Sequence, residues 1–116
     1  RPSVLLVEDL APLALAMKDE LEHRGFTVIG PASSVAQASA MARATPPCAA
    51  ILDVNLGDEQ VYPLIPTLEA ANIPMVLLTG HEPSSLPEAV RHIPVLPKPV
   101  ELDDVERFIR GQCGRS

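Results

Sequence analysis

The chain has 116 residues, a length that suits one folded domain with a single core. Hydrophobic residues make up 47% and charged residues 21%, which is a globular composition and not a disordered one. Fifteen acidic against nine basic side chains give a net charge of −6, which argues against a nucleic-acid-binding face. No apolar run approaches the roughly 20 residues that cross a bilayer, and no signal-peptide pattern opens the chain. We therefore expect one cytoplasmic domain over residues 1–116, without membrane contact.

The two cysteines, Cys48 and Cys113, show neither a CxxC motif nor a Cys/His spacing, so the sequence indicates no zinc site and no redox motif. Two free thiols suit a reducing cytosol. The cysteine count also leaves a single disulfide open.

Short apolar runs alternate with stretches of helical periodicity. The apolar runs predict five strands, over residues 3–8, 26–30, 48–54, 74–79 and 93–97. Between the first two strands, the spacing of apolar residues predicts a helix that ends at Gly25. Its predicted buried face consists of Leu10, Leu13, Ala14, Met17 and Leu21.

Four more helices are predicted along the chain. A capping box from Ser34 to Gln37 begins one that runs to about residue 43. The next runs from residue 61 or 63 to 71, with its start left open by Pro66. A short helix is expected around residues 86–91, and a last one presents Leu102, Val105, Phe108 and Ile109 on one face. Five strands alternating with five helices predict an α/β fold, a parallel sheet covered on both faces.

Polar residues stand at four of the strand ends, where ligands bind in such sheets. These residues are Glu8 and Asp9, Asp53 followed by Asn55, Thr79 followed by Gly80, and Lys98. Three carboxylates at close range raise one another's pKa unless a cation lies among them, and Mg²⁺ (or Mn²⁺) suits such oxygen ligands. Asp53 can then act as a nucleophile toward phosphorus, while Thr79 and Lys98 contact the phosphoryl oxygens.

Four motifs in this order resemble the receiver domain of two-component response regulators, the CheY-like superfamily. They are Leu5-Leu-Val-Glu-Asp9, Ile51-Leu-Asp-Val-Asn-Leu-Gly57, Leu77-Leu-Thr-Gly80 and Leu96-Pro-Lys-Pro99. The resemblance covers about residues 3–109. It implies the flavodoxin-like receiver fold, a doubly wound sheet of strand order 2-1-3-4-5 with five helices. It also implies a phosphorelay function, in which a sensor histidine kinase or phosphotransfer protein donates a phosphoryl group and the domain signals by a conformational change.

The resemblance assigns a role to each site residue. Asp53 is implied as the phosphoacceptor, and the Lys98–Pro99 bond is expected to be cis. The implied Mg²⁺ ligands are Glu8, Asp9, Asp53 and the backbone carbonyl of Asn55. The implied phosphoryl-binding residues are Thr79, Gly80 and Lys98. Asn55 and His81 occupy positions that can tune hydrolysis in the family, although a loop histidine needs no such role.

The sequence departs from the family at its switch. Val95 stands three residues before Lys98, where an aromatic residue usually couples to the hydroxyl of the Thr79 position. The segment from Thr79 to Lys98 is also short, at 19 residues, and it contains several prolines. These features are similar to a variant group of small stand-alone receivers that lack the switch aromatic, so the usual relay from Thr79 to the output face lacks its aromatic residue here.

Under the phosphorelay hypothesis, the domain promotes its own phosphorylation but is not an enzyme with a metabolite substrate. Two other functions compete with this hypothesis. A phosphatase of the haloacid-dehalogenase type needs an acid two residues after its nucleophile, where this chain has Asn55. Such enzymes also place metal-binding acids after the lysine, and Asp103 and Asp104 lie in a predicted helix instead. The second alternative is an interaction domain that works without phosphorylation. The outer faces of the last two helices leave room for a homodimer.

Overall fold

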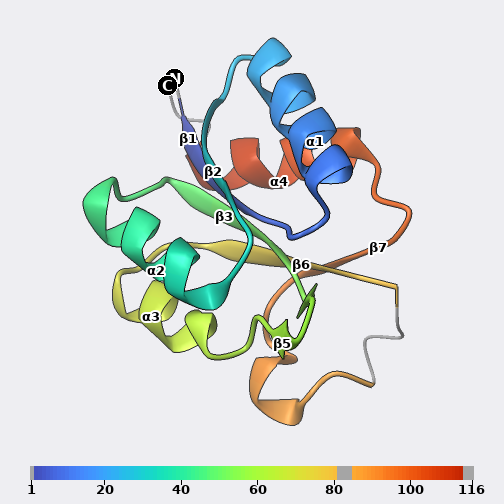
Figure 1. Cartoon of the computed structure of the whole chain (residues 1–116). Helices are drawn as coiled ribbons and strands as arrows, with labels where there is room; N and C mark the ends of the chain where they lie inside the picture. Colours follow the sequence, from blue (N-terminus) through green and yellow to red (C-terminus); the bar gives the residue numbers. More distant parts are fainter. Residues whose placement is uncertain (1, 81–84, 114–116) are drawn as a thin grey trace.

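The computed structural model describes residues 2–80 and 85–113. Its centre is a parallel sheet of five strands in the order β2-β1-β3-β6-β7, which confirms the 2-1-3-4-5 order (Figure 1). These strands are β1 (Ser3–Val7), β2 (Thr27–Ala32), β3 (Ala49–Asp53), β6 (Met75–Thr79) and β7 (Val95–Pro97). The pairing places Val7 beside Leu52, and Leu52 beside Leu77. The strands therefore end together, along one edge of the sheet.

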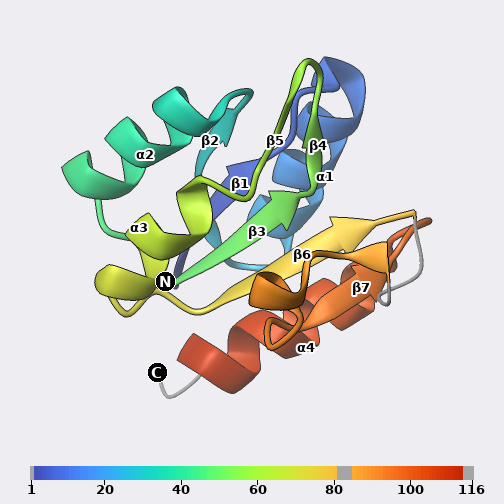
Figure 2. The ribbon, with the colours of Figure 1, turned by 90° about the horizontal axis from the view of Figure 1, so that it is seen from below.

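Four α-helices cover the two faces of the sheet within the described residues (Figures 1 and 2). Helices α1 (Ala11–His23) and α4 (Leu102–Cys113) lie on one face, and α2 (Val35–Ala44) and α3 (Leu64–Ala70) lie on the other. Side chains alternate along each strand. In β1, Val4 and Leu6 pack with α1 and α4, whereas Leu5 and Val7 pack with α2 and α3.

The expected helix around residues 86–91 is wrong, because the structure has only a 3-10 turn there, Glu88–Val90. Pro87 precedes this turn and Pro94 follows it closely. Proline supplies no backbone N–H and disfavours helical backbone at the residue before it. The turn buries Val90 and Leu86 against the α2–α3 side of the core and then leads into β7, the edge strand.

The start of α3 lies at Leu64, after Pro63. This resolves the difficulty with Pro66, which is the third residue of the helix. The first backbone N–H groups of a helix have no partner within it, so a proline there removes no hydrogen bond.

The buried face of α1 is narrower than expected. Ala14, Met17 and Leu21 are buried, but Leu10 is 60% and Leu13 is 43% exposed. Gly25 ends the helix as expected, with a φ of +98° that favours glycine.

The expected loop after β3 contains a small hairpin. Strands β4 (Asn55–Leu56) and β5 (Glu59–Gln60) pair antiparallel around a two-residue turn. Gly57 takes the first turn position with a φ of +65°, and glycine at this position is typical of two-residue hairpins.

The structure joins Cys48 and Cys113 in a disulfide, so the expectation of two free thiols is wrong and the open alternative applies. The bond connects the residue before β3 to the last residue of α4. It lies near the amino-terminal ends of the strands, at the opposite edge of the sheet from Asp53.

Candidate functional site

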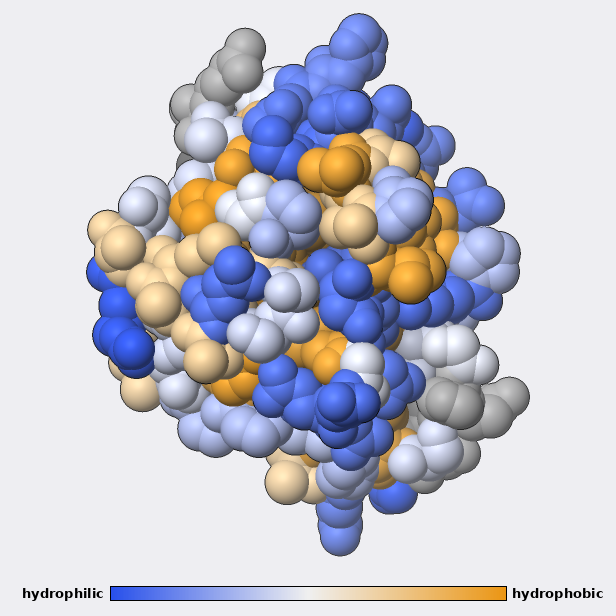
Figure 3. Space-filling view, viewed as in Figure 1, coloured by the Kyte–Doolittle hydropathy of each residue, from blue (hydrophilic) through white to orange (hydrophobic). Residues whose placement is uncertain are grey.

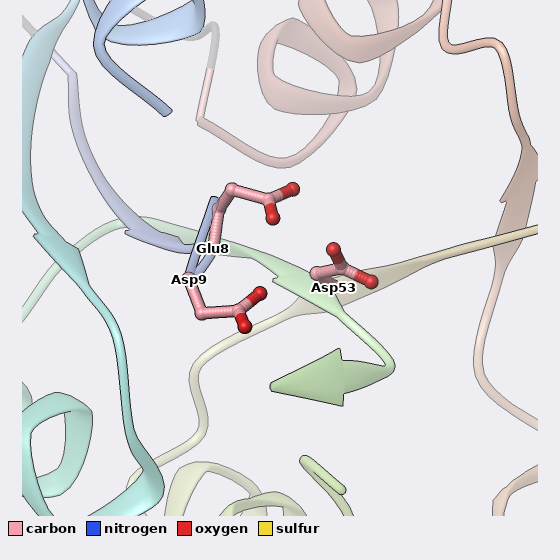
Figure 4. Close-up of side chains that lie close together, drawn as sticks. All are labelled: Glu8, Asp9 and Asp53. Atoms are coloured by element: carbon pink, nitrogen blue, oxygen red, sulfur yellow. The ribbon is translucent and has the colours of Figure 1, made fainter. Parts of the chain in front are cut away.

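Three carboxylates meet at the carboxyl edge of the sheet. Glu8 and Asp9 follow β1, and Asp53 ends β3; their side chains are directed into the same space (Figure 4). Each residue offers an oxygen that lies within 4.8 Å of the oxygens from the other two. Glu8 and Asp53 are each 3% exposed, whereas Asp9 is more open to solvent. The sheet therefore concentrates negative charge at a largely buried point.

Glu8 is the most perturbed acid of the site. Burial, followed by the neighbouring Asp53 side chain, raises the pKa of Glu8 from 4.5 to about 7. Its Oε2 accepts a hydrogen bond from the backbone N–H of Leu10, at 3.2 Å. Its buried Oε1 has no hydrogen-bond partner among the described residues. An unsatisfied buried carboxylate oxygen is costly, so this atom points to a ligand at the site.

Lys98 supplies the nearest positive charge. Its Nζ donates to Oδ2 of Asp53 at 2.9 Å, and the backbone N–H of Asn55 donates to the other carboxylate oxygen at 3.2 Å. Lys98 follows β7, whose residue Pro97 pairs with Thr79. The edge of the sheet thus brings together the lysine and the acid, which are 45 positions apart in the sequence.

Thr79 ends β6 and is buried, at 1% exposure, next to the strand that ends in Asp53. Its carbonyl oxygen accepts the backbone N–H of Lys98 at 2.9 Å. Gly80 follows as an exposed residue, and among the described residues, its chain neighbours apart, no atom lies within 4 Å of the place where a Cβ would be. Thr79 and Lys98 are therefore tied together at the rim of the site.

The donor set fits a hard divalent cation. Three carboxylates in reach of one another, one of them with an unsatisfied oxygen, match the oxygen ligands that Mg²⁺ prefers. The Lys98 ammonium alone leaves a net negative charge among three carboxylates. The residues can accordingly hold such an ion, with Asn55 placed directly beyond Asp53.

The other expected positions are Val95, His81 and the bond between Lys98 and Pro99. Val95 is partly buried and packs with the α2–α3 side of the core, so its side chain is part of the hydrophobic packing. His81 lies outside the described residues. The Lys98–Pro99 peptide bond is cis, as expected.

The sequence reasoning missed how the hairpin of β4 and β5 meets the site. A Cβ added to Gly57 would lie 3.3 Å from Oδ2 of Asp9, so the tip of the hairpin packs against the carboxylate. Glu59 reaches in the other direction and accepts the backbone N–H of Val35 at 3.1 Å. The Gly-Asp turn between the apolar Leu56 and Val61 was the available signal for a hairpin.

A mostly apolar pocket adjoins the acids, between α1 and the start of α4. It has a volume of about 300 Å³, and Glu8 and Lys98 contribute to its wall. The apolar lining comes from Leu13, Ala16, Met17, Leu78, Pro99, Val100 and Leu102. The acidic site is consequently bordered by apolar surface on the α1 side.

The chain is similar to bacterial proteins that are named as regulators. No protein-family model matches it. The photosynthetic apparatus regulatory protein RegA of Cereibacter sphaeroides is 32% identical over 110 residues, which are 89% of this chain and 58% of that protein. The chain thus spans less than two thirds of the length of this curated relative.

Two solved structures are also similar to this chain. The BeF3-activated conformation of SdrG from Pseudomonas melonis Fr1 is 38% identical, with a TM-score of 0.77 and 92% coverage of each chain. The signal receiver domain of a modulated diguanylate cyclase from Desulfovibrio desulfuricans G20 is 25% identical, with a TM-score of 0.81, and the match covers 98% of this chain and 94% of that one.

In the part of the chain that the structure describes, no helix is both long and apolar enough to cross a membrane.

Proposed function

The chain belongs to the receiver-domain family of response regulators, and from this premise we propose that Asp53 accepts a phosphoryl group from the phosphohistidine of a sensor kinase or phosphotransfer protein. The observation that carries the proposal is the position of Asp53. Its carboxylate is buried among the acids of the site, and one of its oxygens lies 2.9 Å from the ammonium of Lys98. The phosphorylated domain then signals through a change of conformation.

The chemistry follows from this arrangement. A carboxylate oxygen of Asp53 forms a bond to phosphorus while the bond from phosphorus to the donor histidine nitrogen breaks, and the leaving imidazole takes up a proton. Lys98 can turn from the carboxylate to a phosphoryl oxygen, and Thr79 and the backbone at Gly80 offer further donors at the same rim. Later hydrolysis of the acyl phosphate by water restores Asp53.

We propose that Mg²⁺ assists this reaction. Asp9, Asp53 and the backbone carbonyl of Asn55 would hold the ion, with Glu8 next to them; Mn²⁺ has similar ligand preferences. When bound, the ion neutralises negative charge on the phosphoryl oxygens. The unsatisfied Oε1 of Glu8 supports this assignment, because a cation or its hydration shell gives that atom a partner.

The surface beside the acidic site supports the proposal that the phosphoryl donor is a protein. Leu10, Leu13 and Leu15 are exposed on and just before α1, where Figure 3 shows apolar side chains at the surface. A donor that brings a phosphohistidine to Asp53 must cover the nearby start of this helix, and its apolar side chains would bury Leu10 and Leu13. We propose that the domain turns over no metabolite.

The phosphatase alternative is not favoured. Asn55 offers an amide in place of the acid that such an enzyme needs two residues after its nucleophile. Asp103 and Asp104 lie in the first turn of α4, where they pair with Arg24 and Arg107. The interaction-domain alternative makes no use of the buried acids, and the test below separates it from the proposal.

The test is labelling with acetyl phosphate and Mg²⁺. We expect acid-labile phosphate on the wild-type chain and none on Asp53→Asn, which keeps the size of the side chain. Asp58→Asn is the matched control, because Asp58 is an exposed aspartate of the adjoining hairpin turn. Labelling of Asp53→Asn at the wild-type level would refute the assignment, and no labelling of the wild type would favour a phosphorylation-independent domain.

A further inference from the structure

Glu59 connects the hairpin beside the acidic site to helix α2. Its Oε2 accepts the backbone N–H of Val35, the first residue of α2, at 3.1 Å. Backbone N–H groups in the first turn of a helix have no partner within the helix and favour negative charge nearby. This exposed contact joins residues 24 positions apart in the sequence, so it links the hairpin to another part of the domain.

The hairpin is too small to hold its own shape. Strands β4 and β5 have two residues each, and an isolated two-stranded hairpin is marginally stable at best. One anchor is Leu56, which is 3% exposed and belongs to the core. Its cross-strand neighbour is Glu59, and the adjacent pair joins Asn55 to Gln60. On the β5 side the buried Val61 donates its backbone N–H to the Val54 carbonyl at 2.9 Å. The link from Glu59 to Val35 is a further anchor, one residue pair from Asn55.

The position of the hairpin affects two proposed metal ligands, Asn55 and Asp9. Asn55 lies at its base, where the backbone N–H contacts Asp53, and would offer its carbonyl to the ion. Gly57 lies at its tip, so close to Asp9 that an added Cβ would be 3.3 Å from Oδ2 of Asp9. A displacement of the hairpin would shift the Asn55 carbonyl and remove the packing that confines Asp9.

We propose that Glu59 is a positioning residue for divalent-cation binding. It holds the hairpin to α2 and thereby keeps the Asn55 carbonyl and the Asp9 carboxylate in the geometry that the ion requires. Mg²⁺ demands near-ideal octahedral geometry, so its affinity is sensitive to small displacements of a ligand. The inference rests on the metal site proposed above and adds to it a residue that does not touch the ion.

The competing explanation is that Glu59 only caps α2. The structure provides a way to separate the two roles, because Ser34 caps the same helix independently. Its Oγ accepts the backbone N–H of Gln37 at 3.1 Å. Ser34→Ala therefore weakens the start of α2 and leaves the link from Glu59 to Val35 in place, whereas Glu59→Ala removes both a cap and the link.

The first experiment measures the affinity of the chain for two divalent ions. Binding of Mn²⁺ is monitored through the electron paramagnetic resonance signal of the free ion, and binding of Mg²⁺ is measured by calorimetry. We expect Glu59→Ala to weaken binding about tenfold, in the range seen when residues that support metal ligands are removed. Glu59→Gln retains an acceptor oxygen and should stay within about twofold of the wild type. Asp58→Ala removes a charge from the same hairpin without breaking the link, so it should stay close to the wild type.

The second experiment measures amide hydrogen exchange without metal. Residues 55–60 should exchange faster in Glu59→Ala, while Ser34→Ala should accelerate only the start of α2. Equal affinities of Glu59→Ala and the wild type would overturn the inference, as would an equal loss in Ser34→Ala. If the wild type itself binds neither ion, the proposed metal site fails and this inference fails with it; if only the Glu59 variants behave unexpectedly, the metal site stands.

Discussion

Lys98 and Asp53 form an ion pair of 2.9 Å, in which the whole side chain of Asp53 is 5% exposed and that of Lys98 is 34% exposed. Lys98 is therefore the more exposed partner of the pair, whereas the acid is buried at the end of β3. The pair also compensates part of the negative charge at the site. The contribution of Lys98 to stability without metal can be measured separately from its proposed role in phosphoryl binding.

Substitution Lys98→Ala should destabilise the metal-free domain. It leaves the buried carboxylates without their nearest cation, and the loss of one partner from a charged hydrogen bond costs about 1–3 kcal/mol. We expect Mg²⁺ to restore more stability to this variant than to the wild type, because the ion supplies the missing charge. Urea unfolding with and without Mg²⁺ measures both values.

A surface pair serves as the control for this variant. Lys18 and Glu22 form an ion pair of 3.2 Å on α1, with both side chains partly exposed. Lys18→Ala should change the unfolding free energy by less than about 0.5 kcal/mol, with no dependence on Mg²⁺. If Lys98→Ala behaves in the same way, Lys98 does not compensate the charge of the site.

The raised pKa of Glu8 predicts a pH dependence of folding without metal. The folded chain keeps a proton on Glu8 up to about pH 7, whereas the unfolded chain releases it near 4.5. This contribution to stability is fully present below pH 4.5 and is lost as the pH rises through 7. It amounts to at most about 3 kcal/mol. Unfolding free energies between pH 5 and 8 should fall more steeply with pH for the wild type than for Glu8→Gln.

The loss of the Glu8 proton near pH 7 also predicts how cation binding changes with pH. A divalent ion favours the ionised form of Glu8, so Mg²⁺ affinity should rise from pH 6 to pH 8 as the proton leaves. In Glu8→Gln this rise should be smaller. Parallel affinity profiles for the two chains would show that Glu8 does not exchange its proton for the ion.

The site could be predicted from the sequence because parallel strands bring their carboxyl ends to one edge. Asp9, Asp53, Thr79 and Lys98 each stand at the end of an apolar run, and local patterns suffice to find such runs. The structure brings all four to the same rim, and the strand order agrees with the expected one. The four positions are far apart in the chain, but the topology leaves them no other place to meet.

The parts that could not be predicted depend on long-range packing. Helical periodicity identifies a stripe of side chains and not the length over which the sheet covers it. Leu10 and Leu13 were therefore expected to be buried, although both are exposed and Leu13 borders the pocket beside Lys98. The link from Glu59 to Val35 and the bond between Cys48 and Cys113 join distant segments. No local sequence pattern at one residue of such a pair identifies the other residue.

Gly30 should be the least replaceable glycine of the domain among those that the structure describes. It has a φ of +104°, and an added Cβ would lie 2.8 Å from the carbonyl oxygen of Leu6 and from the backbone nitrogen of Ala32. Both atoms belong to paired strands and cannot move away. We expect Gly30→Ala to lower the unfolding free energy by about 2–3 kcal/mol or more.

Gly25→Ala separates the two causes of this loss. Gly25 has a similar φ of +98°, but nothing lies within 4 Å of an added Cβ. This variant should therefore cost about 1 kcal/mol, from backbone strain alone. A loss in Gly30→Ala no larger than that in Gly25→Ala would contradict the predicted clash with β1.

Reduction of the bond between Cys48 and Cys113 should destabilise the domain without altering the acidic site. The bond closes a loop of 65 residues, and the entropy that such a loop removes from the unfolded chain corresponds to about 4 kcal/mol. Because the bond lies at the edge of the sheet opposite Asp53, Mg²⁺ affinity should stay within about twofold of the oxidised chain. Urea unfolding of oxidised and reduced protein, with alkylation to count free thiols, tests the first expectation, and the doubly substituted Cys48→Ser/Cys113→Ser chain controls for the reductant. Equal stability of all three forms would show that the bond contributes nothing, and a reduced chain that loses Mg²⁺ affinity would show that α4 communicates with the site.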